Sequence, residues 1–313
     1  MGRRSPSDLL AAARDGDRAA LARVLSLIER GGEPAREIGR QVVQEPGAAT
    51  TVGITGAPGA GKSTLTNALL DVIRGADQRV AVLAIDPSSP FTGGAILGDR
   101  VRMGDHALDD QVFVRSMATR GHLGGLAVAA PEAVRVLGVA GFDWVLVETV
   151  GVGQVEVEVA GQADATVVVV NPGWGDAVQA AKAGLMEIAD VFVVNKADRP
   201  GADETRRDLE RMLDLAGVEG DDRPPVRLAV GTSGEGVAEV WDAVVARLDH
   251  LRATGALDER RRRRAGDEIT RLVAARLLER AQATTRGPRA DALAEAVAAG
   301  KVDPWTAADE LLG

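Results

Sequence analysis

One stretch of the sequence, Gly56–Ser63, combines residue types and spacing that suit the binding of phosphate groups. Its glycines allow the backbone to turn tightly and to point successive N–H groups at phosphate oxygens. Lys62 would reach the β- and γ-phosphates, and the hydroxyl of Ser63 would ligate Mg²⁺. Because an apolar run precedes the stretch and a helix-like run follows it, a P-loop that binds a nucleoside triphosphate is favoured over a turn without a ligand. The residues expected to line it are Ala57, Pro58, Gly59, Ala60, Gly61, Lys62, Ser63 and Thr64.

A second stretch, Asn195-Lys196-Ala197-Asp198, has the residue order of a guanine-binding loop. The Asp198 carboxylate can accept hydrogen bonds from N1–H and the exocyclic amine of guanine, whereas adenine offers an unprotonated N1 there. Lys196 would pack its aliphatic stem over the base, and Asn195 would tie this loop back to the P-loop. The sequence therefore favours GTP over ATP. Backbone N–H groups expected to close the base pocket belong to Thr232, Ser233 and Gly234.

Several acidic residues are candidates for holding Mg²⁺. Glu148 ends an apolar strand-like run, where a carboxylate would hold the ion directly or through water. Asp86 ends another such run, and Asp99 follows in a glycine-rich loop, so both are candidates for the oxygen shell of the ion. For Asp99, a loop-capping role explains the residue equally well. The N–H of Gly151 would meet the γ-phosphate.

The residue that orients the attacking water is less evident. GTPases of the Ras type place a glutamine directly after the glycine that meets the γ-phosphate, and this position is Val152 here. Gln154 is the candidate substitute, although the sequence does not fix its geometry. We therefore expect slow intrinsic hydrolysis, with a partner needed to order the catalytic loops.

The elements that must position these residues alternate between strand-like and helix-like runs over residues 51–251. Several strand-like runs are continuous in Val, Ile and Leu, which is typical of a parallel sheet covered by helices on both faces. The predicted fold is an α/β P-loop NTPase with a doubly wound, mostly parallel sheet and ligands at the carboxyl ends of its strands. Expected strands after Thr51–Thr55 are Arg79–Ile85, Gln111–Arg115, Trp144–Glu148, Ala165–Val170, Val191–Asn195 and Val226–Val230. Expected helices include Pro131–Val139, Ala177–Ile188, Glu204–Leu215 and Val237–Leu251.

Helical segments flank this domain on both sides. Residues 1–50 contain a helix that Asp17 would cap, and they are expected to pack beside the sheet. Residues 252–313 are expected to form a helical arm that packs on the body or on another subunit, and so to be a dimerisation element. The run Arg260–Arg264 is flanked by acidic residues, which predicts a solvated helix face rather than a nucleic-acid site. The amphipathic stripe of the arm consists of Ile269, Leu272, Val273, Arg276, Leu277 and Ala281.

Composition narrows the classes of function. A formal charge of −9 in 313 residues argues against a general binder of nucleic acid or anionic membrane. The sequence has no cysteine and only 3 scattered histidines, so thiolate or histidine-cluster metal sites are not expected. No apolar stretch approaches membrane-spanning length, and a cytoplasmic location is the expectation.

The motifs resemble the MeaB/ArgK family of GTPases, which are associated with methylmalonyl-CoA mutase. The resemblance covers nearly the whole chain, and the blocks at 94–103 and 148–154 are more specific than the P-loop. The matching blocks, in the family's order, are Gly56–Ser63, Asp86–Ser89, Gly94–Met103, Arg120–Gly125, Glu148–Gln154, Asn195–Asp198 and Asp303–Trp305.

The resemblance implies a homodimeric GTPase that acts as chaperone of an adenosylcobalamin-dependent acyl-CoA mutase. GTP binding and hydrolysis would gate cofactor loading and the removal of damaged cofactor, and a cobalamin adenosyltransferase is a second implied partner. By resemblance, Lys182 in the loop from Pro172 is the candidate for stabilising charge in the mutase-stimulated reaction. Trp174 and Val155 depart from the family pattern, so the client remains open between methylmalonyl-CoA mutase and related mutases. The alternatives are a metal-insertion GTPase and a transport-linked ATPase or kinase.

Overall fold

The computed structural model describes residues 4–44, 49–86, 106, 108–118, 125–149, 162–173 and 187–313. The chain divides into two compact units, Met1–Arg262 and Arg263–Gly313. The first unit contains the predicted P-loop and guanine-binding loop, and the second contains most of the predicted arm. The functional division at residues 50 and 251 stays a prediction.

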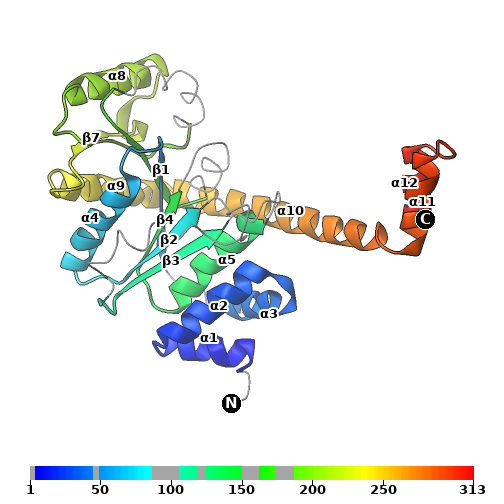
Figure 1. Ribbon diagram of the computed structural model, residues 1–313. Coiled ribbons are helices and arrows are strands. Elements are labelled where there is room, and N and C mark those ends of the chain that lie inside the picture. Colours follow the sequence, from blue (N-terminus) through cyan, green and yellow to red (C-terminus); the bar gives the residue numbers. More distant parts are fainter. Residues whose placement is uncertain are drawn as a thin grey trace. The chain divides into compact units, whose positions relative to one another are not determined.

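The first unit is built on a seven-stranded sheet in the order β3-β2-β4-β1-β5-β6-β7, with all pairings parallel (Figure 1). Each residue of β1, β4, β5 and β6 is buried, because helices cover both faces. The predicted α/β class is therefore confirmed. The strands are β1 Thr50–Gly56, β2 Val80–Asp86, β3 Val112–Ala118, β4 Trp144–Thr149, β5 Ala165–Val170, β6 Val191–Asn195 and β7 Val226–Ala229.

Alternate strand residues pack on different helices. On one face, Val52 and Leu146 share a core with α4 (Lys62–Gly75) and α9 (Val237–Ala253). On the other face, Val145 packs with α5 (Gly125–Val139) and the N-terminal helices, while Val168 packs with α8 (Ala202–Leu215). This period of two along each strand is what a sheet covered on both sides requires. A short 3₁₀ turn, η3 (Gly220–Asp222), follows α8.

The N-terminal helices α1 (Pro6–Arg14), α2 (Arg18–Arg30) and α3 (Gly32–Gln44) pack on one another, and α2 and α3 also contact α5 (Figure 1). Asp17 caps α2 by accepting a hydrogen bond from the N–H of Ala20 at 2.9 Å, as the sequence predicts. The helical layer beside the sheet is therefore confirmed.

The expected element bounds are close to the observed ones, with two exceptions. The strand expected at 111–115 extends to Ala118, and the helix expected from Pro131 begins at Gly125. The residues before Pro131 are rich in alanine, which favours helix. The helix therefore starts before Pro131 and includes this proline, although a proline has no N–H to donate. Most of the helix expected at 177–188 lies outside the described residues.

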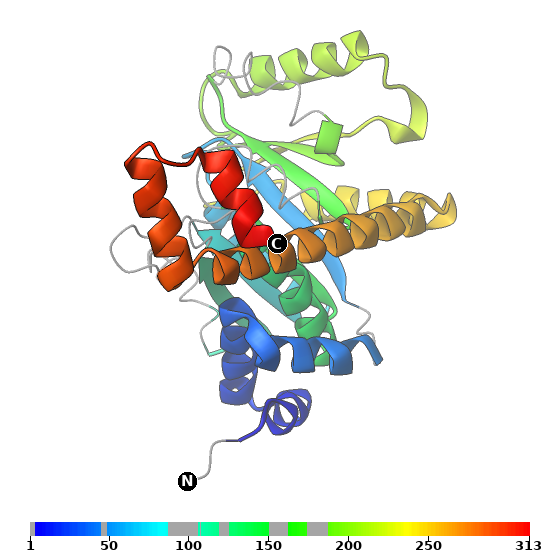
Figure 2. The ribbon, with the colours of Figure 1, turned by 90° about the vertical axis from the view of Figure 1, so that its right-hand side faces the viewer.

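The chain ends in the helices α10 (Ala256–Thr284), α11 (Pro288–Ala298) and α12 (Pro304–Leu312), and α11 packs on α12 (Figure 2). Asp303 caps α12, and a hydrogen bond from the Thr306 hydroxyl lowers the pKa of the Asp303 carboxyl. Apolar side chains of the predicted stripe are exposed within this unit: Ile269 by 62%, Val273 by 52% and Leu277 by 57%. In the described part of the chain, none of the helices is both long and apolar enough to cross a membrane.

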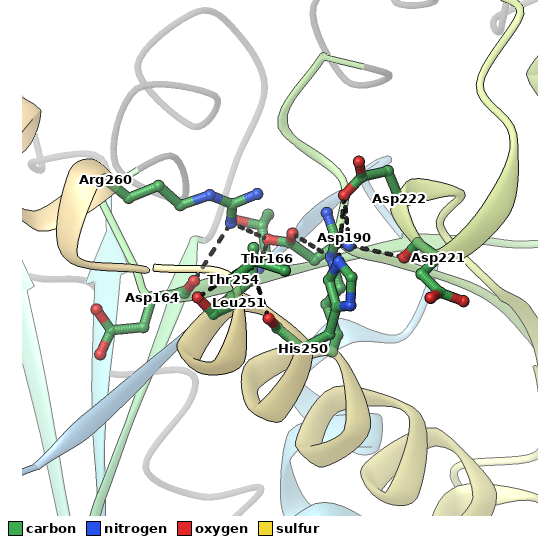
Figure 3. A network of polar contacts seen from close by, with 10 residues as sticks. Asp164, Thr166, Asp190, Asp221, Asp222, His250, Leu251, Thr254 and Arg260 are labelled. Carbon is green, nitrogen blue, oxygen red and sulfur yellow. Dashed lines mark hydrogen bonds and ion pairs between the residues drawn. The ribbon is translucent and has the colours of Figure 1, made fainter. Parts of the chain in front are cut away.

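The edge at which the parallel strands begin holds a cluster of charged side chains (Figure 3). Asp164 and Asp190 immediately precede β5 and β6 and are 2% and 1% exposed. Asp164 accepts a hydrogen bond from the N–H of Thr51 at 3.2 Å, and Asp190 accepts one from the N–H of Thr166 at 2.9 Å. These buried carboxylates therefore satisfy strand N–H groups where the strands start.

Arginines from α9 and α10 neutralise the two carboxylates. Arg261 binds Asp164 through two hydrogen bonds of 3.0 and 2.7 Å, and this pairing raises the pKa of the Arg261 guanidinium. Asp190 lies 2.8 Å from Arg260 Nη1 and 3.1 Å from Arg247 Nε. The prediction of a solvated helix face holds for Arg261, whose side chain is 47% exposed, whereas the Arg260 side chain is only 28% exposed. Both are recruited by buried carboxylates that are distant in sequence and would be costly to leave unpaired.

Candidate nucleotide-binding site

The glycines at the two ends of the P-loop have conformations and surroundings that admit no side chain. Gly56, the last residue of β1, has φ 138°, and a Cβ there would lie 1.9 Å from the carbonyl oxygen of Val169. Gly61, directly before α4, has φ 89°, and a Cβ there would lie 2.5 Å from Asn195 Nδ2. Glycine at both positions lets the loop approach the backbone of β5 and the Asn195 side chain closely before the helix starts.

The first two residues of α4 are turned into the loop. Lys62 Nζ donates hydrogen bonds to the carbonyl oxygens of Gly56, at 2.8 Å, and Ala57, at 3.2 Å. The hydroxyl of Ser63 donates to Glu148 Oε1 at 2.5 Å. Lys62 and Ser63 are each 7% exposed, so a cation and a hydroxyl are held in a largely water-excluded site at the positive end of a helix.

The oxygen donors at this point suit a hard divalent cation. Glu148 lies near the carboxyl end of β4, is fully buried, and brings its carboxylate to the Ser63 hydroxyl. Mg²⁺ is commonly bound by one or two protein oxygens while it keeps several waters, so this pair fits the ion. Asp86 ends β2, which pairs with β4 up to Ile85 and Thr149, so its backbone lies at the same edge of the sheet. Among the described residues, no group of three or more His, Cys, Asp or Glu side chains forms a metal site.

Asn195 connects the guanine-binding loop to the rest of the site. It ends β6, and its Nδ2 donates to the carbonyl oxygens of Ala60 and Gly61, at 2.9 and 3.2 Å. Its Oδ1 accepts from the N–H of Gly231 at 3.0 Å, so one buried amide holds the P-loop and the turn after β7 together. The structure therefore places Asn195 in the position that the sequence predicts, between the guanine-binding loop and the P-loop.

The next residues of this loop lie nearer to solvent. Lys196 Nζ donates to the carbonyl oxygen of Gly59 at 2.6 Å, so its stem spans from the guanine-binding loop to the P-loop. Its φ of 60° is uncommon for a residue with a side chain and is typical of tight functional loops. Asp198 follows in an exposed turn, where its carboxylate is accessible to a ligand.

The turn after β7 is closed by its own backbone hydrogen bonds. The N–H groups of Ser233 and Gly234 both donate to the carbonyl oxygen of Val230, at 3.1 and 2.9 Å. These two N–H groups close their own turn, and a base pocket formed with Thr232, Ser233 and Gly234 stays a prediction. Gly231 lets this turn approach α4 closely, because a Cβ at this position would lie only 3.1 Å from the backbone nitrogen of Leu65.

The described site residues gather at one edge of the sheet, because the strands that carry them are parallel and end together. Other predicted residues lie outside the described residues: Asp99, Gly151, Gln154 and Lys182, together with the side chain of Asp86. Two buried threonines at this edge, Thr55 and Thr149, were not singled out by sequence reasoning. Thr149 lies within the matching block Glu148–Gln154, and Thr55 directly precedes the P-loop.

Comparison with known proteins agrees with this arrangement. A family model described as methylmalonyl-CoA mutase-associated GTPase MeaB matches residues 21–286. A Pyrococcus abyssi protein is 47% identical over 97% of this chain and 95% of its own length. The mouse methylmalonic aciduria type A homolog, a mitochondrial protein, is 33% identical over 95% of this chain and 76% of its own length.

A solved structure described as an LAO/AO transport system kinase has a TM-score of 0.72 and 25% identity, and the match covers 99% of this chain and 97% of that chain. The matches confirm the family resemblance and the P-loop GTPase fold. This chain belongs to the methylmalonyl-CoA mutase-associated GTPase family MeaB.

Proposed function

We propose that this GTPase serves an adenosylcobalamin-dependent acyl-CoA mutase, either methylmalonyl-CoA mutase or a close relative. In this proposal, GTP binding and hydrolysis gate the loading of the cofactor and protect or reactivate the mutase. A cobalamin adenosyltransferase is a second expected partner. The observation that carries the proposal is the match of residues 21–286 to a family described by its association with that mutase. The mouse relative, named for methylmalonic aciduria, supports the same client.

The arrangement of the site supports a specific course of hydrolysis. The ammonium of Lys62 would leave the Gly56 and Ala57 carbonyl oxygens and stabilise negative charge on the β- and γ-phosphates. Asp198 would accept hydrogen bonds from guanine while Lys196 covers the base. Water would attack the γ-phosphorus in line, with Gln154 as its candidate orienting residue and Lys182 as a further cation in the mutase-stimulated reaction.

The remaining assignments concern the metal and the loops. Mg²⁺, when bound by Ser63 and Glu148, with Asp86 and Asp99 as further candidates, would neutralise charge on the β- and γ-phosphates. Gly151, Gln154 and Lys182 lie in segments that we propose respond to loss of the γ-phosphate and so change affinity for the mutase.

A transport-linked kinase is the second candidate, because the solved relative with a TM-score of 0.72 carries that description. It would be expected to use ATP, whereas the Asn195–Asp198 loop is suited to guanine. A metal-insertion GTPase is less well supported, because the sequence has no cysteine and 3 scattered histidines.

The test measures nucleotide hydrolysis with and without a purified adenosylcobalamin-dependent methylmalonyl-CoA mutase, using GTP and ATP in separate arms. We expect the mutase to stimulate GTP hydrolysis at least about tenfold and ATP hydrolysis not at all, since guanine selection and partner contact both act on the same loops. An unrelated protein of similar charge is the control. Equal use of ATP would support the kinase alternative, and GTP hydrolysis that no acyl-CoA mutase alters would contradict the mutase role.

We further propose that α10 forms a homodimer interface. Its exposed Ile269, Val273 and Leu277 recur every four residues, which places them along one side of the helix. We expect sedimentation equilibrium to show a dimer, and Val273→Asp to weaken it by at least about tenfold, because a charge in an apolar interface is costly. Gln282→Asp, at an exposed polar position of α10, is the matched control. A monomeric wild-type protein at tens of micromolar would exclude this interface.

A further inference from the structure

At their carboxyl ends, β1 and β4 no longer form backbone pairs with each other. Their backbone pairing runs from Thr50 with Trp144 to Ile54 with Glu148 and ends there. Beyond that point, β1 continues to pair with β5 as far as Gly56, while β4 continues to pair with β2 through Thr149. The two strands that carry the P-loop and the Mg²⁺ candidate Glu148 therefore lose their mutual backbone pairing just before the site.

A pair of threonine hydroxyls bridges this point. The hydroxyl of Thr149 lies 3.2 Å from the hydroxyl of Thr55 and 3.4 Å from the carbonyl oxygen of Ile54. Thr55 and Thr149 are 0% and 1% exposed. The side-chain contact thus takes over from the backbone pairing one residue closer to the nucleotide site.

Packing alone does not require a hydroxyl at Thr149. Valine has the same shape, occupies neighbouring positions 145 and 147 of β4, and avoids the cost of burying a polar group. The adjacent carboxylate, Glu148, must meet the hydroxyl of Ser63 across the site, and its position depends on where β4 ends relative to β1. A hydroxyl link at Thr149 fixes that distance.

We propose that Thr149 is a positioning residue for GTP hydrolysis. Its hydroxyl holds the end of β4 against Thr55, the residue before the P-loop, and so keeps the Glu148 carboxylate in register with Ser63. In this proposal Thr149 binds neither the nucleotide nor the metal and acts through Glu148. The inference rests on the GTPase activity of the family and is independent of the mutase client.

The test compares Thr149→Val, which removes only the hydroxyl, with Thr149→Ser, which keeps it. We expect the valine variant to lower kcat about five- to tenfold, the rate equivalent of a hydrogen bond worth about 1 kcal/mol, with KM for GTP changed less than about twofold. The same variant should weaken the Mg²⁺-dependent part of GDP affinity by a similar factor, measured by calorimetry with and without Mg²⁺. The serine variant should stay within about twofold of wild type in both measurements.

Thr51→Val is the matched control, because Thr51 is another buried threonine of β1 whose hydroxyl bonds the backbone of Asp164 at the opposite edge of the sheet. It should lower the melting temperature without changing kcat or Mg²⁺ dependence. If Thr149→Val does not fold, Thr55→Val removes the same link from the other side and should give the same kinetic change. The proposal is overturned if Thr149→Ser is as slow as the valine variant, if neither link variant differs from wild type, or if Thr51→Val slows hydrolysis equally.

Discussion

Replacement of Lys62 by alanine is expected to lower GTP hydrolysis by about 10² to 10³-fold, the usual effect of removing one group that stabilises charge in the transition state. The Lys62 ammonium is held inside the P-loop by the Gly56 and Ala57 carbonyl oxygens, and at 7% exposure it has few water contacts to replace. Electrostatic stabilisation is strong in such a site. The fold should persist, because the Lys62 ammonium bonds the carbonyl oxygens of Gly56 and Ala57, and α4 keeps its own backbone hydrogen bonds without it.

The measurement is single-turnover hydrolysis of GTP, with circular dichroism to check the fold. Lys301→Ala is the control, since Lys301 is an exposed lysine in the second unit and should have no effect. If the mutase proposal holds, Lys62→Ala should also abolish every nucleotide-dependent effect on the mutase. A residual rate within tenfold of wild type would mean that the charge is stabilised by other groups.

Replacement of Asp190 by asparagine is expected to destabilise the protein by about 3 kcal/mol, near the lower end of the range for breaking a buried ion pair. Asp190 is 1% exposed and neutralises both Arg247 and Arg260, whose side chains are 10% and 28% exposed. The introduced amide can still accept from the N–H of Thr166, but Arg260 loses its carboxylate partner, and Arg247 keeps only its more exposed pairing with Asp222 at 3.3 Å among the contacts of the described residues. The partial exposure of Arg260 is why we expect the lower end of the range.

Urea unfolding followed by circular dichroism gives the free energy of unfolding directly. Asp249→Asn is the matched control, because Asp249 pairs with Arg252 on the same helix α9 at 2.9 Å, but with side chains 64% and 44% exposed. An exposed pair contributes about 0–1 kcal/mol, so this variant should be near wild type. Equal destabilisation by both variants would show that the buried cluster contributes no more to the free energy of unfolding than an exposed ion pair.

Much of the fold was predictable because its signals are local. Continuous apolar runs such as those of β5 and β6 report a sheet buried on both faces, and their bounds agree with the structure. Asp17 and the helix that it caps were also predictable, since the cap and the apolar face lie within about three turns. The contact of Asn195 with the P-loop was also predictable, because it follows from the residue order Asn195–Asp198.

Other features depend on contacts between distant residues and could not be read in this way. The arginines in the second turn of α10 have acidic neighbours in sequence, yet Arg260 and Arg261 pair with aspartates 70 and 97 positions away. Whether the Ser233 N–H faces a ligand or closes its own turn depends on backbone geometry that residue types do not specify. The bridge between Thr55 and Thr149 likewise appears only when the divergence of β1 and β4 is known.

The contacts of the Asn195 amide are expected to couple the binding of the phosphates to the binding of the base. Since one side chain holds both the loop around the phosphates and the turn beside the base, ordering either half prepares the other. Guanosine and pyrophosphate, offered as separate fragments, should therefore favour each other's binding. We therefore expect the base and the phosphates of the diphosphate product to be released together, and substitutions of Asn195 to change base preference and phosphate affinity together.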